Sequence, residues 1–405
     1  MICADGSEAG TAPTWGMPFR VIRSIYNRDQ DSEWITALYP YMKRFLDWWL
    51  KYRTDSEGWF HCKCSWESGQ DASKRFLVAE GNPAAVSDFV RTVDVEAAMA
   101  EAFRNMVFFS AVAGHPRDTD DWRSLAARRI ETTRAMYVDG WFRDFDSRNN
   151  KPIILKDYYD VMMLYPLAAG IATEEQARAI APRFKYFAEN PTFWLEWPSF
   201  LFPFSEGAWN AGLQEFIGTI IANTASRVYA RTDARHTKAI TFPDSDPELT
   251  KILDTFPQTF RYRIPGIANE FWPIADDNPG GCENYGWGAT LPTLIIRNVI
   301  GYRELDDSQE NAFQLAPALP KEFLKTGESY GVKNLRFRTT QTDLNHEVTD
   351  ASRLAVKLSV RGRFKGLSVR DKSGTVLATV SAGGNQAEAT FFATNGKVYM
   401  VTIAT

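Results

Sequence analysis

The feature that most constrains the fold is a change in hydrophobic spacing in the last third of the chain. From residue 14 to about residue 301, apolar side chains recur at helical intervals, as at Val95, Met99, Ala102 and Met106. After about residue 305 the apolar residues alternate with polar ones, as over 354–360, and Gly and Asn separate these segments. The sequence therefore predicts packed helices followed by a small antiparallel β region.

Short turns join the expected helices, and longer loops between them carry Trp, Gly and carboxylate residues. The spacing predicts about nine helices, at 34–38, from Pro40 onward, and at 95–113, 122–136, 159–169, 173–187, 209–230, 246–256 and 285–301. Helical hairpins stacked side by side collect their loops on one rim. The pattern thus predicts a mainly α fold, either a helical toroid or an open helical array, with a site at one end.

The expected domain boundaries follow from the same change in spacing. Residues 1–305 are expected to form the helical domain, residues 306–330 a linker, and residues 331–405 a small β-sandwich-like domain. Pro317 and Pro320 lie in the expected linker, and pairs such as Asn395-Gly396 mark turns between strands.

Charge and composition exclude several classes of protein. The chain has 46 Lys and Arg against 50 Asp and Glu, a net charge of −4, so no basic surface for nucleic acid or a membrane is expected. The longest uncharged apolar stretch, residues 161–172, is shorter than the ~20 residues that span a bilayer. The first residues lack the features of a signal peptide. A cytoplasmic location is therefore expected, or a secreted one if the sequence continues upstream; the oligomeric state stays open.

The densest group of reactive residues is the segment 64–75, Cys-Ser-Trp-Glu-Ser-Gly-Gln-Asp-Ala-Ser-Lys-Arg. Glu67 and Asp71 flank a glycine and follow Trp66. Glycoside hydrolysis needs one carboxylic acid to protonate the leaving oxygen and a second carboxylate on the opposite face of the sugar. An aromatic neighbour would stack on the sugar and raise the pKa of the acid. The alternative is a surface loop whose carboxylates cap a helix and pair with Lys74 or Arg75.

A second group lies in residues 269–288 and combines carboxylates, glycines and aromatic residues. Glu270 is followed by Glu283, Asn284 and Trp287, and the segment leads into the last expected helix. Such a loop can supply a base that activates water and hydrogen bonds to sugar hydroxyls. The alternative is an ordinary turn that caps the helix.

Other candidate residues have simpler explanations. Asp94 and Glu96 open a helix, where the helix dipole alone favours acidic residues. Trp209 follows Glu206, and a Trp beside carboxylates can line a sugar site, although packing in the core is its commoner role. His61-Cys62-Lys63-Cys64 lacks a second Cys/His pair at zinc-site spacing, and no phosphate-binding or dinucleotide motif is present. We expect neither a metal nor an organic cofactor.

Taken together, these segments resemble the (α/α)6-barrel, or six-hairpin, glycosidases of the glycoside hydrolase family 63, trehalase and mannosylglycerate hydrolase type. Residues 66–75 resemble the Glu-Ser-Gly-x-Asp-x-Ser-x-Arg signature of that clan. Residues 93–96, 141–146, 165–172, 269–271 and 281–288 are similar to its later motifs and occur in the same order. The resemblance covers about residues 14–301.

The resemblance implies a hydrolase that inverts an α-gluco- or α-manno-configured glycoside. Asp71 would be the general acid and Glu270 the general base, with Glu283 as the alternative base. Inverting pairs stand ~6.5–9.5 Å apart, against ~5–5.5 Å in retaining enzymes. The residues that the resemblance places around the sugar are Trp66, Glu67, Trp209, Glu283, Asn284 and Trp287. The implied partner is a carbohydrate substrate.

Three departures from the family keep other interpretations open. The base motif has Phe271-Trp272 where the family usually has a Tyr-containing pair, so Glu283 remains a candidate base. The family's Arg-Gly-Pro-x-Trp segment reads Glu206-Gly-Ala-Trp here, and the barrel needs about twelve helices where about nine are expected, so its first helices are missing. The chain could therefore be a carbohydrate-binding pseudoenzyme or a fragment of a longer glycosidase. A polysaccharide lyase is a further possibility, but lyases favour Tyr, His and Arg sites, and the four histidines are scattered.

Overall fold

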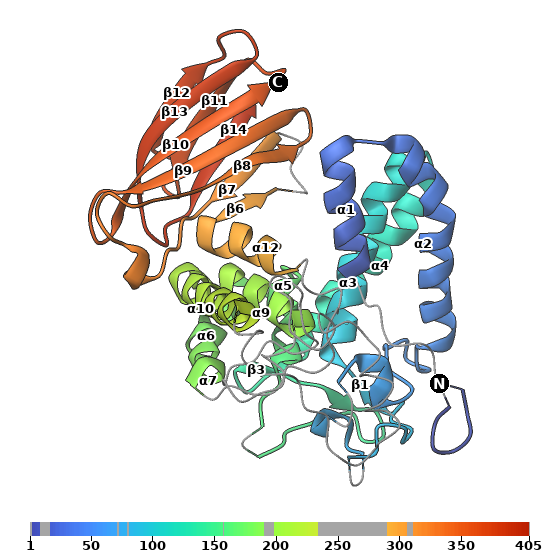
Figure 1. The fold of residues 1–405 in the computed structure, drawn as a ribbon. Helices are drawn as coiled ribbons and strands as arrows, with labels where there is room; N and C mark the ends of the chain where they lie inside the picture. The colour runs from blue at the N-terminus through green and yellow to red at the C-terminus, as the bar shows by residue number, and fades with distance from the viewer. Residues whose placement is uncertain are drawn as a thin grey trace, which may run out of the picture.

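A computed structural model describes residues 2–8, 17–70, 73–78, 81–156, 158–189, 198–233, 290–305 and 311–404. Figure 1 shows helices over the first part of the chain and two β-sheets over the last part. This confirms the expected order of a helical region and a separate β region. The expected helix at 246–256 lies outside the described residues, as do five candidate site residues: Asp71, Glu270, Glu283, Asn284 and Trp287.

The first two helices form an antiparallel pair, α1 (Met17–Asp29) and α2 (Ser32–Tyr52). In α2 every third or fourth residue is buried, at Ile35, Tyr39, Met42, Leu46 and Trp49. The expectation that a new helix begins at Pro40 is wrong, because α2 continues through it. Pro40 is exposed, so water can bind the carbonyl that lacks its helical partner.

Helix α3 (Val93–Val112) is the centre of the helical region. It packs against α1, α2, α4 (Pro116–Ala135) and α5 (Tyr165–Ala168), and most of its residues are buried. Gly114, with φ of +77°, ends the segment, and Pro116 opens α4 at its first turn, as the sequence predicts. A helix buried on all sides is a rigid support for residues at either of its ends.

Most of the remaining helices are shorter, and they are linked to α3 through α5, against which α9 packs (Figure 1). A 3-10 turn over Val161–Leu164 leads into α5. It is followed by α6 (Glu174–Ile180), α7 (Phe184–Glu189), α9 (Pro198–Asn210), α10 (Gln214–Asp233) and α12 (Thr290–Ile295), which continues as a π turn over Ile296–Ile300. The helix expected at 209–230 is two helices, because Gly212 turns the chain with φ of +81°. Among the described residues, no helix is long and apolar enough to cross a membrane.

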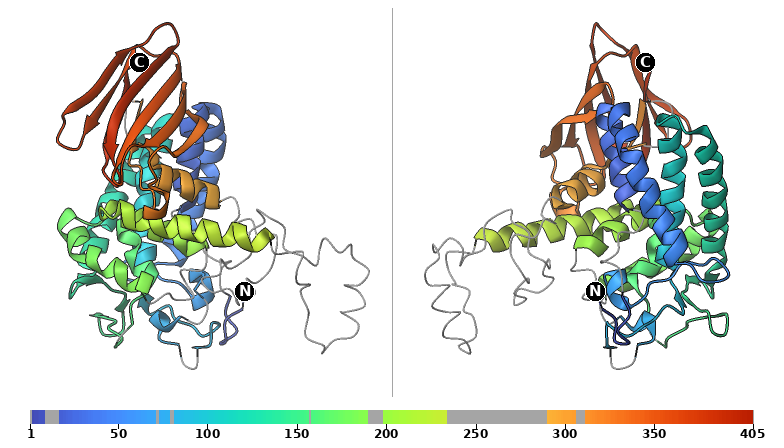
Figure 2. Two further views of the ribbon diagram at one scale, coloured as in Figure 1. Left: turned by 60° about the vertical axis from the view of Figure 1, so that its left-hand side comes forward. Right: turned by 90° about the vertical axis from the view of Figure 1, so that its right-hand side faces the viewer.

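Loops gather near the amino end of α3, where two small sheets order them (Figure 2). Strand β1 (Val90–Arg91) pairs with β4 (Phe145–Asp146), which pairs with β5 (Lys151–Pro152). Strands β2 (Tyr137–Val138) and β3 (Trp141–Phe142) form a hairpin, and Asp139 and Gly140 at its turn both have positive φ. These pairings bring the segments around 65, 90 and 145 together at one end of the helical region.

The β region is a pair of antiparallel sheets with a shared buried core. One sheet has the order β13-β10-β9-β8 and the other has the order β12-β11-β14-β7-β6. The strands are β6 (Tyr302–Glu304), β7 (Asn311–Leu315), β8 (Ser329–Phe337), β9 (Thr340–Val348), β10 (Arg353–Gly362), β11 (Gly366–Asp371), β12 (Val376–Ser381), β13 (Gln386–Thr394) and β14 (Tyr399–Ala404). The expected alternation is present in β10, where Leu354, Val356, Leu358 and Val360 are buried.

The β region begins earlier than the sequence indicates. Strand β7 lies inside the segment expected to be a linker, and it is an inner strand of its sheet between β14 and β6. Residues 306–330 are therefore not a simple connection, and the first strand begins at Tyr302 rather than after residue 331. The reason is that β6 and β7 are too short to show a clear alternation, and the pairing of β7 with β14 joins residues far apart in the sequence.

Close backbone contacts join the helical and β regions. Gly301 has φ of +84°, and a Cβ atom there would lie 2.0 Å from the carbonyl oxygen of Ala316, so only glycine fits. His346, fully buried in β9, has its Nε2 atom 3.0 Å from the carbonyl oxygen of Ile300. The end of α12 is therefore held against the β-sheets by contacts that leave no space for a hinge.

The buried imidazole of His346 predicts a loss of stability in acid. Burial lowers the pKa of His346 to about 4, whereas an unfolded histidine titrates near 6.5. The unfolded chain therefore binds a proton that the folded chain excludes, and stability is lost as the pH falls through this interval. From about pH 7 to about pH 4.5 we expect His346→Gln to remove about 2 kcal/mol of pH dependence from the unfolding free energy. Urea unfolding at both pH values measures this, with the exposed His115→Gln as the control. Equal pH dependence in the native chain and His346→Gln would contradict the prediction.

Candidate active site

The loop singled out by its sequence, residues 64–75, is anchored on one side through Glu67. Glu67 lies in a 3-10 turn over Ser65–Ser68 and is buried. Arg53, at the end of α2, donates from Nε to Glu67 Oε2 at 2.9 Å and from Nη2 to Oε1 at 2.5 Å. The backbone N–H of Lys63 donates to Oε2 at 2.6 Å. Glu67 thus pairs with Arg53 and not with Lys74 or Arg75, and its two oxygens fasten the loop to α2.

Arg75 anchors the other side of the loop, and its guanidinium is completely buried. It donates from Nε and Nη2 to the two oxygens of Asp144, at 2.8 and 2.9 Å, and from Nη1 to Gln70 Oε1 at 2.7 Å. A further bond runs from Nη2 to Asp94 Oδ1. Burial alone would lower the pKa of Arg75, but Asp144 and Asp94 raise it well above its ordinary value.

A third set of contacts fixes the residues on both sides of position 71. Gln70 Nε2 donates to Asp160 Oδ1 at 2.8 Å, and Tyr158 donates its hydroxyl hydrogen to Asp160 Oδ2 at 2.7 Å. The hydroxyl of Ser73 lies 3.0 Å from that of Tyr158. Asp160 also accepts a bond from the backbone N–H of Met162, which starts the turn before α5. Gln70 and Ser73 are therefore held by the same carboxylate and tyrosine.

The first turn of α3 contributes two buried carboxylates to this end of the molecule. Asp94 uses one oxygen for Arg75, and its Oδ2 atom is buried without a hydrogen-bond partner among the described residues. Burial raises the pKa of Asp94, against the attraction of Arg75. Glu96 accepts a 2.6 Å bond from the N–H of Phe60 and lies 3.2 Å from Arg129, while burial raises its pKa to about 7. Both residues therefore make specific contacts in addition to the expected interaction with the helix dipole.

Two candidate tryptophans lie in different places. Trp66 is half-buried and packs against Cys3 and Cys64 beside the anchored loop. Trp209 is buried at the end of α9, and the guanidinium of Arg303 lies 3.9 Å from the centre of its ring. The described structure thus brings Trp66 and Glu67 together with Arg75 and Asp94, whereas Trp209 lies in a second polar cluster. Of the expected catalytic and sugar-binding residues, only these three, Trp66, Glu67 and Trp209, fall within the described ranges.

Several residues of the anchored site were missed from the sequence. Arg53, Tyr158 and Asp160 are 14 or about 90 positions from their partners, so no local motif connects them. Asp144 lies in a segment that resembles a family motif, which was the available signal. Within the described ranges no three His, Cys, Asp or Glu side chains are arranged to hold a metal ion.

Comparison with known proteins shows what the helical region and its anchored loop are similar to. Residues 18–198 match the sequence profile of the mannosylglycerate hydrolase MGH1-like glycoside hydrolase domain. The chain is also 29% identical over 121 residues to the periplasmic trehalase of Salmonella newport (strain SL254), a segment that spans 28% of this chain and only 20% of the trehalase. These matches confirm the resemblance to the six-hairpin glycosidases.

Solved structures give the same answer for the fold. The GH63 mannosylglycerate hydrolase from Thermus thermophilus in complex with glucose is 18% identical, with a TM-score of 0.51, over 73% of this chain and 78% of that chain. An uncharacterized conserved protein from the same organism is 18% identical with a TM-score of 0.51, over 71% and 77% of the two chains. At this level of identity the likeness concerns the fold alone.

The network around Arg75 predicts a large difference between two arginine substitutions. Arg75→Gln would leave the carboxylates of Asp94 and Asp144 buried without their cation, which costs about 3–5 kcal/mol. The matched substitution Arg123→Gln removes an exposed arginine that pairs with exposed Asp120, and such pairs contribute about 1 kcal/mol or less. Chemical denaturation of both variants measures the two losses. Equal, small losses would show that the buried network does not hold the loop.

Proposed function

We propose that this chain is an O-glycosyl hydrolase that cleaves an α-linked gluco- or manno-configured glycoside with inversion. The observation that carries the proposal is the anchoring of Gln70 and Ser73, the described neighbours of Asp71, by Asp160 and Tyr158. An acid that must meet a glycosidic oxygen needs a fixed position, because small displacements cost large factors in rate. The glycoside hydrolase profile over residues 18–198 supports the same reaction class.

The two carboxylates of the loop divide into an anchor and a proton donor. Both oxygens of Glu67 already accept bonds from Arg53 and from the N–H of Lys63, which suits a residue that positions the loop. We therefore assign the general acid to Asp71, whose carboxylic proton passes to the glycosidic oxygen as the bond to the anomeric carbon breaks. Glu67 would act on the sugar site through the loop.

The second half of the reaction needs a base on the opposite face of the sugar. We assign it to Glu270, with Glu283 as the alternative, both from the resemblance of their segments to the family motifs. The base takes a proton from water while the water oxygen bonds to the anomeric carbon, so the product has the inverted configuration. Trp66, Asn284 and Trp287 are the proposed sugar contacts. Trp209 is not kept among them, because it lies in the second polar cluster with Arg303 against its ring.

Asp94 is a further polar group for the same site. Its Oδ2 atom is buried and lacks a hydrogen-bond partner among the described residues, while Arg75 holds its other oxygen. A buried acceptor without a partner is costly unless something binds it. A sugar hydroxyl would satisfy this oxygen, and we include Asp94 among the residues that orient the substrate. We also propose that the helices belong to an (α/α)6 toroid, in keeping with the fold of the glucose-bound Thermus thermophilus enzyme.

Hydrolysis of a panel of α- and β-glycosides by the purified chain tests the proposal. We expect activity on an α-glycoside, with the inverted anomer as the first product in a time-resolved NMR spectrum. Asp71→Asn and Glu270→Gln should each lower kcat by about 10²–10⁴, the usual contribution of a general acid or base. Asp120→Asn, an exposed carboxylate on α4, is the matched control and should leave kcat unchanged.

Four outcomes would contradict parts of the proposal. A retained anomer would exclude the inverting mechanism. An unchanged rate in Asp71→Asn would exclude Asp71 as the acid, and loss of activity in Glu283→Gln but not in Glu270→Gln would move the base to Glu283. Sugar binding by calorimetry without hydrolysis of any glycoside would support a non-catalytic carbohydrate-binding protein instead.

A further inference from the structure

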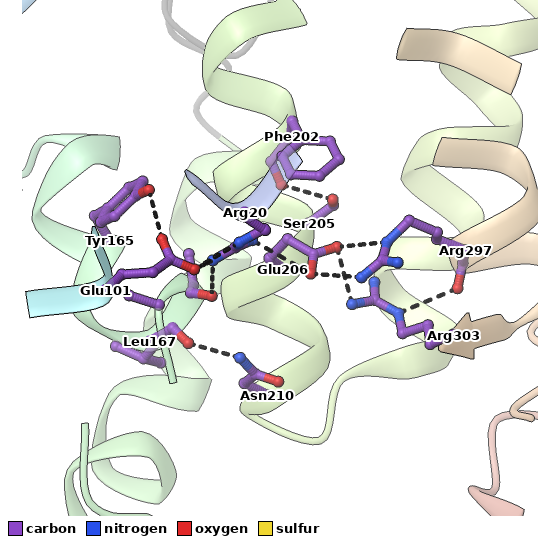
Figure 3. A network of polar contacts seen from close by, with 12 residues as sticks. Arg20, Glu101, Tyr165, Leu167, Phe202, Ser205, Glu206, Asn210, Arg297 and Arg303 are labelled. Atoms are coloured by element: carbon purple, nitrogen blue, oxygen red, sulfur yellow. Dashed lines mark hydrogen bonds and ion pairs between the residues drawn. The ribbon is translucent and has the colours of Figure 1, made fainter. Parts of the chain in front are cut away.

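A cavity of about 400 Å³ lies on the helical region beside the β-sheets, away from the anchored loop. Six elements with their adjoining turns form its wall: α1, α3, α5, α9, the segment from the end of α12 into β6, and β7. Figure 3 shows part of this wall, where side chains from these elements converge. The nearest approach to the loop is along α3. Arg104 lies ten residues beyond Asp94 on that helix, a rise of about 15 Å.

Arginine is the most frequent ionisable residue in the wall. The lining contains Arg20, Arg23, Arg104, Arg297 and Arg303 against three carboxylates, Glu101, Glu206 and Glu304. The excess is two positive charges. Positive charge confined in a poorly solvated wall attracts an anion more strongly than the same charge on an open surface.

The carboxylates of the wall are already compensated. Glu206 lies 2.9 Å from both Arg297 and Arg303 and 3.6 Å from Arg20 (Figure 3). Burial alone would raise the pKa of Glu206, but the three arginines lower it to about 2. Glu101 accepts a 2.6 Å bond from Arg20 Nε and a 3.1 Å bond from the hydroxyl of Tyr165.

Glu304 is compensated in the same way from outside the cavity. Arg28 lies 3.1 Å from Glu304, and Arg297 lies 3.5 Å from it. The carboxylates of the wall therefore pair with arginines of the wall and also with Arg28, which lies outside it. This pairing leaves positive charge in excess within the cavity.

Arg104 is the arginine of the wall that offers a cation to a ligand. Its Nη2 atom donates to the carbonyl oxygen of Ala169 at 2.8 Å. Within the described ranges no carboxylate lies within ion-pair distance of its guanidinium. The guanidinium is half-buried and lines the cavity, so four of its five N–H groups remain for a ligand or for water.

The pKa of Arg303 reflects its burial among other arginines. Burial first, and then the nearby Arg297 and Arg20, lower the pKa of Arg303 to about 9, despite its contact with Glu206. A bound anion would relieve this repulsion. The amides of Asn105, Asn210 and Gln314, which also line the cavity, can bind hydroxyl groups around such an anion.

We propose that this arginine-lined cavity is a binding site for a small carboxylate or phosphate anion, separate from the glycosidase site. The forked guanidinium of Arg104 matches the paired oxygens of either group. The ligand would connect α3 to β6 and so link the helical region to the β-sheets. Because the ligand would bind the folded chain and not the unfolded chain, it would raise the melting temperature. The proposal does not depend on glycosidase activity.

Isothermal calorimetry and thermal melts of the intact chain test this site. The probes are inorganic phosphate and acetate, with acetamide as the neutral control and sodium chloride at equal ionic strength as the control for screening. We expect at least one anion to bind and to raise the melting temperature, and acetamide and chloride to do neither. Binding of acetate alone would identify a carboxylate ligand, and binding of phosphate alone a phosphate ligand.

Three variants decide whether binding occurs in this cavity. Arg104→Gln should weaken anion binding about tenfold or more, since it removes a charge-assisted bond. Glu304→Gln should strengthen it severalfold, because it removes a competing negative charge. Arg117→Gln, an exposed arginine of α4 outside the cavity, is the matched control and should leave the affinity unchanged.

Arg104→Gln and Glu304→Gln are expected to change the affinity in opposite directions, so the test does not depend on either variant alone. If Arg104→Gln does not fold, Glu304→Gln still reports on the site. Absence of binding by both anions would overturn the proposal. Binding that neither Arg104→Gln nor Glu304→Gln changes, or that Arg117→Gln weakens equally, would also overturn it.

Discussion

The buried guanidinium of Arg75 is the interaction on which this end of the molecule depends. It bonds to Asp144, Asp94 and Gln70, so the loop before it, the strands near residue 145 and the first turn of α3 are fixed relative to one another. Taking these charges out of water is expensive, and good geometry on every side of the guanidinium offsets that cost. Two carboxylates around one arginine still leave an excess of negative charge at this end of α3.

Helix α3 extends from this negative site to the positive cavity. Its first turn carries Asp94 and Glu96, and Arg104 lies past its middle. Asp94 and Glu96 lie in the first turn, where the helix dipole favours negative charge. Arg104 lies about 15 Å from Asp94 along the same helix. The acidic residues of the anchored site and the arginine that α3 contributes to the cavity are therefore kept apart on one largely buried element.

Much of the helical region could be predicted because its signals are local. The apolar spacing of α3 and the stop at Gly114 are contained within a few turns. The prediction at Pro40 was wrong because exposure to solvent, which spacing does not reveal, lets the helix continue. Strand β9 was not recognised because its inward residues include Thr342 and His346, so it lacks an apolar alternation. Its register is set instead by its pairing with β8 and β10. That pairing depends on residues spread across the β region and not on a local pattern.

The candidate site shows the same division between local and distant information. The order Trp, Glu, Gly and Asp identified the loop, but its supports, Arg53 and Asp160, lie far from it in sequence. Those supports change the interpretation of Glu67. The family resemblance implies that its carboxylate binds the sugar, but in the structure the carboxylate bonds to Arg53 at the end of α2. Both oxygens of Glu67 are engaged by Arg53 and by the N–H of Lys63, so Glu67 is poorly placed to give a proton to a substrate. Of the two carboxylates of the loop, this argues for Asp71 as the proposed acid.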